Sequence, residues 1–357
     1  MNSPPLPSRT EDSMLRLKIR SYAKEQRQVL RTSATDALRF GLGQIWNEIS
    51  ELENLSAKDV SGLAARIKRR KHATAEDMYR LSHAFLQGNE NINTFAGIPG
   101  AMQVLVKELS GANIQRQIDA AECFCNLSLG DAHVSEKIAA LAGSYLVTYL
   151  DGKEQRLKRS CLWTLANILE TCTKAAKTLL QMQLVPKLWK LYTAPPDDLN
   201  KFQTDAGTCL RLIATHSGGL VSDLDRGYIV EHLEEMSLEA QGSEYFMYIL
   251  FQLEIVHAKR ELSVQQAESL VNFFVGSLDS SWSAIYGVRV MVNLLANGES
   301  QLLGCLAAPE QFLAVLNRLF ALRNANLNCD LLRLLKNYLS LNLVDSNLLL
   351  EQLKVYA

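Results

Sequence analysis

The chain has 357 residues, of which 48% are hydrophobic and 21% are charged. This composition is typical of a folded globular protein and excludes a largely disordered or collagen-like chain. The net charge of −1 is unevenly spread, because residues 1–80 hold 15 Lys and Arg against 10 Asp and Glu, whereas residues 81–357 hold 22 against 28.

Residues 1–80 form a basic leader that we expect to be partly disordered and partly helical. Two segments concentrate its positive charge. Residues 14–31 place six Lys and Arg on an expected helix, opposed only by Glu25. The second segment is a dense cluster, made of Arg66, Lys68, Arg69, Arg70 and Lys71. Such runs can bind a partner, act as localisation signals or simply be solvated faces of helices.

Helix-like apolar patterns and chain breakers then alternate. A Gly-Ile-Pro break precedes the amphipathic segment 101–110, which Gly111 ends. A longer helix is predicted over 113–129, where the small residues Ala120 and Ala121 would allow close helix packing. The same order of a helix punctuated by Gly or Pro and then a longer helix returns over 141–170 and 183–216.

Aligning the longer helices reveals an internal repeat. The pitch is 41–44 residues, and the equivalent positions are Ala84, Asn126, Asn167, Arg211, Gln252, Asn293 and Asn337. Helical peaks at this pitch are typical of armadillo and HEAT arrays. The order of two shorter helices and one long helix favours armadillo repeats. The sequence therefore predicts an all-α, right-handed armadillo-repeat solenoid of about seven repeats over residues 81–357.

We call these seven positions the amide slots, and the positions four residues earlier the aromatic slots. Side chains four residues apart share one face of a helix. The aromatic slots hold Arg80, Glu122, Trp163, Gly207, Tyr248, Arg289 and Arg333. We predict that a concave groove for an extended peptide is lined by Asn126, Trp163, Asn167, Tyr248, Gln252, Asn293 and Asn337.

The predicted chemistry of this groove follows from the side chains. An amide can pair with both the N–H and the C=O of a peptide main chain, whatever its sequence. An aromatic ring can cover the stem and charge of Lys or Arg. Arg211, Arg289 and Arg333 would instead repel a basic peptide. Two alternatives stay open: each Asn can hold neighbouring repeats together, and Trp163 can be an ordinary core residue.

The alternation of Trp and Asn resembles the array with which importin-α holds basic nuclear localisation signals. A closer resemblance covers roughly residues 95–185, where "AAECFCNLS", "GSYLVTYL" and "CLWTLANI" are similar to the family named transmembrane and coiled-coil domain-containing protein six. Those proteins are armadillo proteins related to importin-α. The resemblance implies a nuclear import adaptor for protein cargo, located in the cytoplasm and the nucleus. It also implies importin-β as a candidate partner of the basic leader. The alternative is a scaffold, unconnected with transport, that holds one dedicated protein.

Other functions find little support in the sequence. The seven cysteines are odd in number and lie in helix-like patterns without metal-ligand spacing, so we expect reduced thiols and no metal or cofactor. The six histidines are scattered outside catalytic motifs, which favours a protein that is not an enzyme and has no small-molecule substrate. Nucleic-acid binding is not expected because the basic runs contain no RNA-binding motif. No apolar stretch reaches the about 18 residues needed to span a membrane.

Overall fold

The computed structural model describes residues 55–195, 202–240, 242–255, 262–276, 281–296 and 309–340. These residues form helices and turns, with no β-strand among them. The chain divides into two units, Met1–Leu105 and Val106–Ala357. The basic segment 14–31 lies outside the described residues, and Arg80, where the predicted leader ends, lies inside a helix.

The first unit contains α3 (Ala57–Arg70), α4 (Ala75–Gln87) and α5 (Asn89–Gly97), which pack against one another. Both α3 and α4 begin with a capping box, in which Ser56 or Thr74 exchanges hydrogen bonds with the Asp three residues later. The buried amide of Asn91 donates to the carbonyl oxygens of Leu55 and Ala84, at 2.9 and 3.0 Å. Helix α6 (Ala101–Leu109) crosses the division between the units.

The described part of the second unit is a succession of α-helices with four short 3₁₀ helices. The α-helices are α7 (Ile114–Leu127), α8 (Ala132–Thr148), α9 (Gln155–Thr171), α10 (Thr173–Leu180), α11 (Leu184–Tyr192), α12 (Gln203–His216), α13 (Asp223–Glu231), α14 (Phe246–Gln252), α15 (Val264–Gly276), α16 (Ser281–Ala296), α18 (Pro309–Ala321) and α19 (Ala325–Ser340). The 3₁₀ helices are η1 (Tyr149–Asp151), η2 (Gly218–Leu220), η3 (Leu233–Glu235) and η4 (Ser243–Tyr245).

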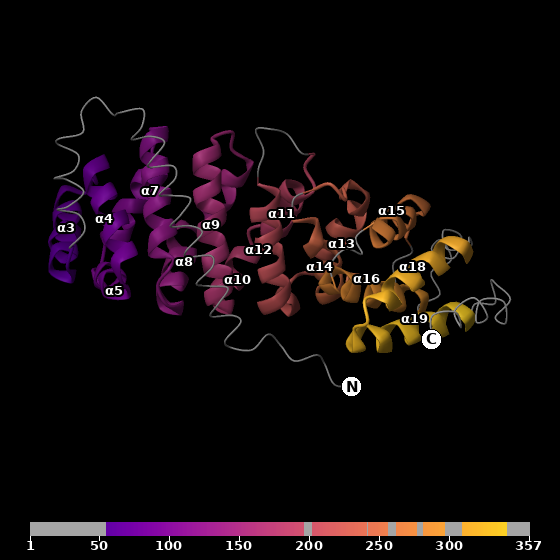
Figure 1. Ribbon diagram of the computed structural model, residues 1–357. Helices are drawn as coiled ribbons and strands as arrows, with labels where there is room; N and C mark the ends of the chain where they lie inside the picture. The colour runs from indigo at the N-terminus through magenta and orange to yellow at the C-terminus, as the bar shows by residue number, and fades with distance from the viewer. Residues whose placement is uncertain are drawn as a thin grey trace, which may run out of the picture. The chain divides into compact units, whose positions relative to one another are not determined.

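A row of helices repeats along the second unit. Helix α7 packs on α9, α9 on α12, α12 on α14, α14 on α16, and α16 on α19, and their order can be followed in Figure 1. Side chains also bridge the chain at one repeat length. The Tyr149 hydroxyl donates to the Leu109 carbonyl 40 residues away, and Trp189 Nε1 donates to the His232 carbonyl 43 residues away. The described part of this unit is therefore a stack of helical repeats.

Two glycines allow close contact between neighbouring helices. Gly143 lies inside α8, and a Cβ at Gly143 would be 3.0 Å from Leu179 Cδ2 on α10. At Gly207 on α12, a Cβ would be only 2.7 Å from the ring of Tyr192. The Tyr192 ring therefore uses the space that a side chain at position 207 would need.

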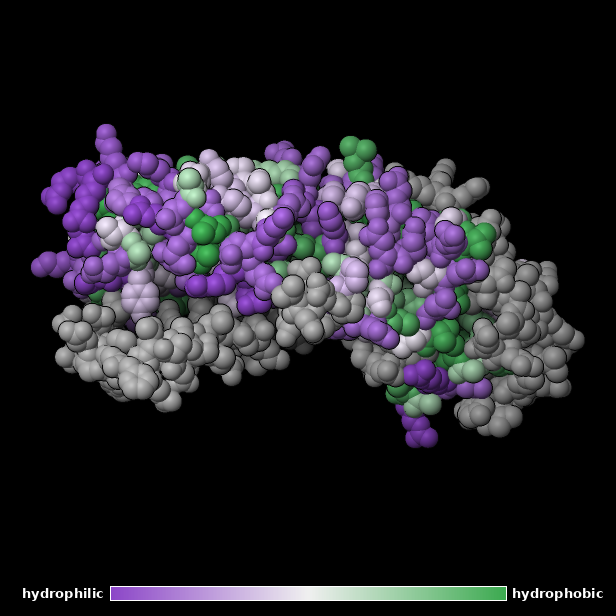
Figure 2. Space-filling view, turned by 90° about the horizontal axis from the view of Figure 1, so that it is seen from above, coloured by the Kyte–Doolittle hydropathy of each residue, from purple (hydrophilic) through white to green (hydrophobic). Residues whose placement is uncertain are grey.

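The apolar side chains predicted to form the core lie between the helices. Ala120 and Ala121 are both fully buried, which confirms the prediction that small residues allow close packing of α7. Trp189 and Tyr192 are among the largest fully buried side chains. Among the coloured residues in Figure 2, hydrophilic side chains cover most of the surface and the hydrophobic ones form small groups.

Candidate functional site

The predicted repeat register places the amide slots of the second unit on successive packed helices. Asn126 lies on α7, Asn167 on α9, Arg211 on α12, Gln252 on α14, Asn293 on α16 and Asn337 on α19. Because each of these helices packs on the next, the slots recur once per repeat. Ala84 lies on α4, in the first unit.

The amides of α7 and α9 lie inside the stack. Only 1% of Asn126 and 7% of Asn167 are exposed. Asn167 Nδ2 donates to Ser128 Oγ at 3.0 Å and to the Cys125 carbonyl at 3.4 Å. Both acceptors lie at the C-terminal end of α7, where the Ser128 hydroxyl also donates to the Cys125 carbonyl at 2.7 Å. In the structure, Asn167 thus joins one repeat to the one before it, as in the first alternative above.

The later slots differ in exposure. Asn337 is half-buried, and its Nδ2 donates to the Val292 carbonyl on α16 at 3.0 Å, again in the preceding repeat. Asn293 is half-buried. Gln252 is exposed at the last residue of α14. Among the amides predicted to line the groove, Gln252 is thus the most accessible in the described part of the chain.

Trp163 forms a pair with a carboxylate that sequence reasoning missed. The half-buried Trp163 donates from Nε1 to Asp205 Oδ1 at 3.2 Å, from α9 to α12. Burial raises the pKa of Asp205 to about 6, against the opposing effects of the Trp163 hydrogen bond and the nearby Arg159 charge. Asp205 lies 42 residues after Trp163, so the repeat pitch itself was the signal that could have found it. The pair offers an aromatic ring beside an incompletely solvated carboxylate.

Tyr248 occupies its aromatic slot within a group of rings. It is buried, and its hydroxyl lies 2.7 Å from Thr215 Oγ1 on α12. The rings of Tyr248 and Tyr286 meet edge to face with centroids 4.8 Å apart, and Phe251 lies 5.6 Å from Tyr286. Because Tyr248 is buried, it affects the predicted binding face mainly by positioning the neighbouring rings that it contacts.

The arginines of the slots also contact aromatic rings. Arg289 lies 5.4 Å from the Tyr286 centroid and 5.7 Å from that of Phe251, and Arg211 lies 5.5 Å from that of Tyr245. Such distances are typical of cation–π contacts. Arg289 Nε and Arg333 Nη1 share one carboxylate, Asp330, at 2.7 and 3.4 Å.

The basic cluster predicted to bind a partner lies at the end of α3. Arg66 and Arg70 both pair with Asp77, whose side chain is 1% exposed, on α4. Lys71 is the C-cap of α3, in the left-handed conformation. Lys68 and Arg69 are exposed. Arg70 and Lys71 are exposed as well, but Arg66 and Arg70 also help to join two helices through Asp77, whereas Lys68 and Arg69 form no ion pair within the described ranges.

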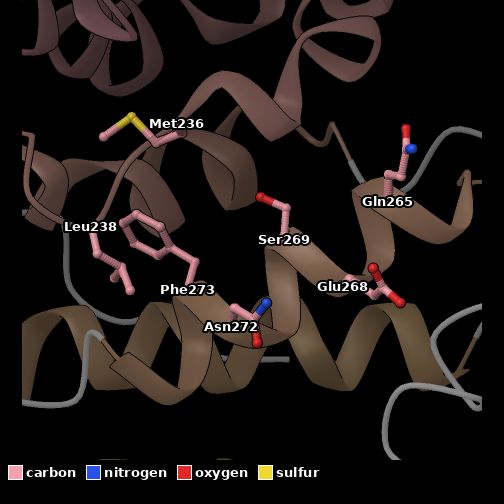
Figure 3. Close-up of a pocket in the computed structure, with 7 residues that line it drawn as sticks. All are labelled: Met236, Leu238, Gln265, Glu268, Ser269, Asn272 and Phe273. Atoms are coloured by element: carbon pink, nitrogen blue, oxygen red, sulfur yellow. The ribbon is translucent and has the colours of Figure 1, made fainter. Parts of the chain in front are cut away.

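A shallow cavity of about 320 Å³ lies elsewhere in the second unit, beside η3 and α15. Its lining residues are Met236, Leu238, Gln265, Glu268, Ser269, Asn272 and Phe273. In Figure 3 the apolar Met236, Leu238 and Phe273 lie near one another, whereas Gln265 and Glu268 lie toward the other end. None of the slot residues lines this cavity.

The described ranges contain neither a metal-binding cluster nor a membrane-spanning helix. No group of three or more His, Cys, Asp or Glu side chains there could hold a metal ion. No helix in those ranges combines the length and apolarity needed to cross a membrane. Five of the six cysteines described are buried, with Cys329 exposed.

No protein-family model matches the chain. Among solved structures, an engineered protein is similar with a TM-score of 0.58 and 19% identity, over 78% of this chain and 68% of that one. Two others are more distant. A computationally designed armadillo repeat protein for modular peptide recognition has a TM-score of 0.43 and 17% identity, over 78% of this chain and 99% of that one. A designed armadillo repeat protein in complex with the peptide (KR)4 has a TM-score of 0.44 and 16% identity, over 80% and 100%.

These likenesses concern the fold alone. The stacking of α7, α9, α12, α14, α16 and α19 at the predicted pitch carries the assignment. The predicted fold class, an all-α armadillo-repeat solenoid, is thereby confirmed. Its handedness and the number of repeats stay predictions.

Proposed function

We propose that this protein is an adaptor that holds an extended segment of another protein against the face formed by α9, α12 and α14. One observation supports this function best. Trp163 and Asp205 form a half-buried pair across two successive repeats, with Nε1 and Oδ1 3.2 Å apart. Stacked repeats commonly use such a continuous face for binding.

The pair suits a Lys or Arg side chain of the bound segment. An aromatic ring attracts a cation and covers its aliphatic stem. Because burial raises the pKa of Asp205, a cation nearby would favour its ionised form and regain part of that cost. Arg159 already acts on Asp205, so a bound cation would have to share this carboxylate.

The Asn-lined groove predicted from the sequence needs one modification. Since Asn167 donates to Ser128 and Cys125, it could pair with a peptide main chain only after releasing those acceptors. The exposed Gln252 has no such requirement. In this proposal, side chains such as Trp163 and Asp205 therefore contribute more to recognition than a complete ladder of amides does.

A binding assay with the full chain tests this function. Fluorescently labelled extended peptides with alternating Lys or Arg are titrated against wild type, Trp163→Ala and Asp205→Asn. Each substitution should weaken binding about 5- to 30-fold, since a central aromatic or charged contact contributes about 1–2 kcal/mol. The control is Leu224→Ala, which removes a side chain that is 86% exposed on α13. Equal binding by all four proteins would overturn the proposal.

The more specific form of the proposal is an importin-α-like adaptor that shuttles between cytoplasm and nucleus and binds importin-β through α3. The exposed Lys68 and Arg69 support it, since cations on a helix face can meet an acidic repeat protein. A pull-down with importin-β should use Lys68→Glu with Arg69→Glu, because Arg66 and Arg70 pair with Asp77. If wild type binds importin-β and this variant does not, the result supports the transport function. Absence of binding by wild type favours the alternative, a scaffold for a dedicated protein.

A further inference from the structure

The geometry points to a second recognition element on the same protein: a cationic, aromatic surface on α14, α16 and α19 that binds an acidic protein segment. We call it the arginine surface and define it by Phe251, Tyr286, Arg289, Asp330 and Arg333. It rests on the proposed function in one respect only, that the repeats bind extended segments. Its ligand is a segment carrying carboxylates or phosphates, opposite in charge to the one proposed for Trp163 and Asp205.

The arginine surface is continuous across three helices. Phe251 on α14 lies 5.6 Å from Tyr286 on α16, and Arg289 of α16 lies over both rings. Arg289 then pairs with Asp330 on α19 at 2.7 Å, and Asp330 pairs with Arg333 at 3.4 Å. The rings and the carboxylate fix the position of Arg289, so its guanidinium loses less conformational freedom when it binds an anion.

The charges of the arginine surface are not balanced. Helices α14, α16 and α19 carry three cations, Arg289, Arg333 and Lys336, and one carboxylate, Asp330. Asp330 is divided between two guanidiniums, and the three helices by themselves carry a net charge of +2, from three cations and one carboxylate. Among the described residues, Glu244 on η4, Glu254 just after α14 and Arg323 just before α19 flank these helices in the chain.

The exposure of the two guanidiniums suits them to different roles. The Arg333 side chain is 71% exposed and can turn toward a ligand, whereas Arg289 is only 16% exposed. A partly buried charge is screened less by salt than an exposed one. Arginine presents several donors in one plane, which matches the oxygens of a carboxylate or a phosphate. The exposed amide of Gln252, at the end of α14, lies one residue from Phe251 and can pair with the main chain of the same segment.

The test uses the full chain and four labelled peptides of equal length: one rich in Asp and Glu, one with phosphoserines in their place, one basic and one neutral. Wild type should bind the acidic peptide at least about 10-fold more tightly than the neutral one, and more weakly as salt is added. Tighter binding of the phosphoserine peptide would identify phosphate as the preferred group, and equal binding would identify negative charge alone. Both results support the arginine surface.

The decisive variant is Arg333→Glu, because Arg333 is exposed and contacts only Asp330 among the ion pairs described. It should weaken binding of the acidic peptide about 10-fold or more and leave circular dichroism unchanged. The matched control is Lys177→Glu, an identical change of net charge on an exposed residue of α10. Equal weakening by the two variants would show a nonspecific charge effect and overturn the proposal.

Further outcomes separate this proposal from the adaptor function. If wild type binds the basic peptide and not the acidic one, the arginine surface is wrong and the adaptor function stands. If wild type binds the acidic peptide and Trp163→Ala does not weaken binding of the basic peptide, the arginine surface stands and the adaptor function is wrong. Light scattering completes the test, since self-association that Arg333→Glu abolishes would assign the surface to a second copy and overturn the proposal.

Discussion

Gly207 on α12 lies directly against the ring of Tyr192 on α11, so that a Cβ at position 207 would stand 2.7 Å from Tyr192 Cε2. The ring cannot move away easily, because Tyr192 is fully buried and its hydroxyl donates to the Gly242 carbonyl at 2.7 Å. We expect Gly207→Ala to lower the free energy of unfolding by about 1–3 kcal/mol through overpacking. Chemical denaturation followed by circular dichroism measures this loss.

Gly219 provides the matched control for that substitution. A Cβ at Gly219 has no atom within 4 Å. Gly219→Ala should therefore shift the denaturation midpoint far less than Gly207→Ala does. If both variants unfold at the same denaturant concentration, the proximity of Tyr192 is not what keeps position 207 small.

The bond from Asn167 to the end of α7 predicts a second effect on stability. Asn167→Ala leaves Ser128 Oγ without its donor in a buried position, and the Cys125 carbonyl keeps the bond from the Ser128 hydroxyl. We expect a loss of about 1–3 kcal/mol, as for a buried group left unsatisfied. A double-mutant cycle with Ser128→Ala, measured by thermal denaturation, should show that the two losses are not additive. Strict additivity would contradict the coupling of the two repeats through this amide.

Asp205 predicts an unusual dependence of stability on pH. Its folded pKa is raised by burial to about 6, whereas an Asp in an unfolded chain titrates near 3.9. The folded protein thus binds this proton more tightly, and its stability falls as the pH rises from about 4 to about 6. Asp205→Asn should remove this decline and stabilise the protein at neutral pH, by at most about 3 kcal/mol. Parallel pH–stability curves for the two proteins would disprove the assignment.

Asp77 predicts the opposite dependence of stability on pH. Although burial raises the pKa of its carboxyl group, hydrogen bonds from Thr74 and Arg66 outweigh that effect and hold the pKa below its usual value. Its stabilising effect is therefore present above the unfolded pKa and is lost as the pH falls below about 4. Asp77→Ala should cost about 1.5–3 kcal/mol at neutral pH, measured by urea denaturation.

A comparison with Asp59 separates the two roles of Asp77, which caps α4 and pairs with Arg66 and Arg70. It caps α3 through Ser56 as Asp77 caps α4 through Thr74, but no arginine bonds to it in the described structure. Asp59→Ala should thus cost less than Asp77→Ala. Equal costs would mean that the capping box alone, and not the pairs with Arg66 and Arg70, accounts for the effect.

The repeat register was the part of the structure that the sequence predicted best. A pitch of 41–44 residues places Asn126, Asn167, Arg211 and Gln252 on successive packed helices, because one face of each long helix must meet the next repeat. The continuity of α8 was not predicted. Gly143 lies inside this helix, where it allows the close approach of Leu179.

The chemistry of the face was harder to predict. A recurring Asn suits either a peptide groove or a bond between repeats, and only the distance to Ser128 reveals the second role of Asn167. Asp205 and Asp330 were missed for a related reason. Each meets its partner, Trp163 or Arg289, across about one repeat, and such pairs depend on how two helices are rotated against each other. A single sequence contains no direct measure of that rotation.

The amides of Asn167 and Asn337 share one more property, which gives the stack a direction. Each donates to a carbonyl of the helix before it, Cys125 on α7 or Val292 on α16. A truncated protein that stops after α9 would keep the bond made by Asn167, whereas one that starts at α9 would lose its acceptors. Fragments truncated from the N-terminal end and from the C-terminal end should accordingly differ in their free energy of unfolding.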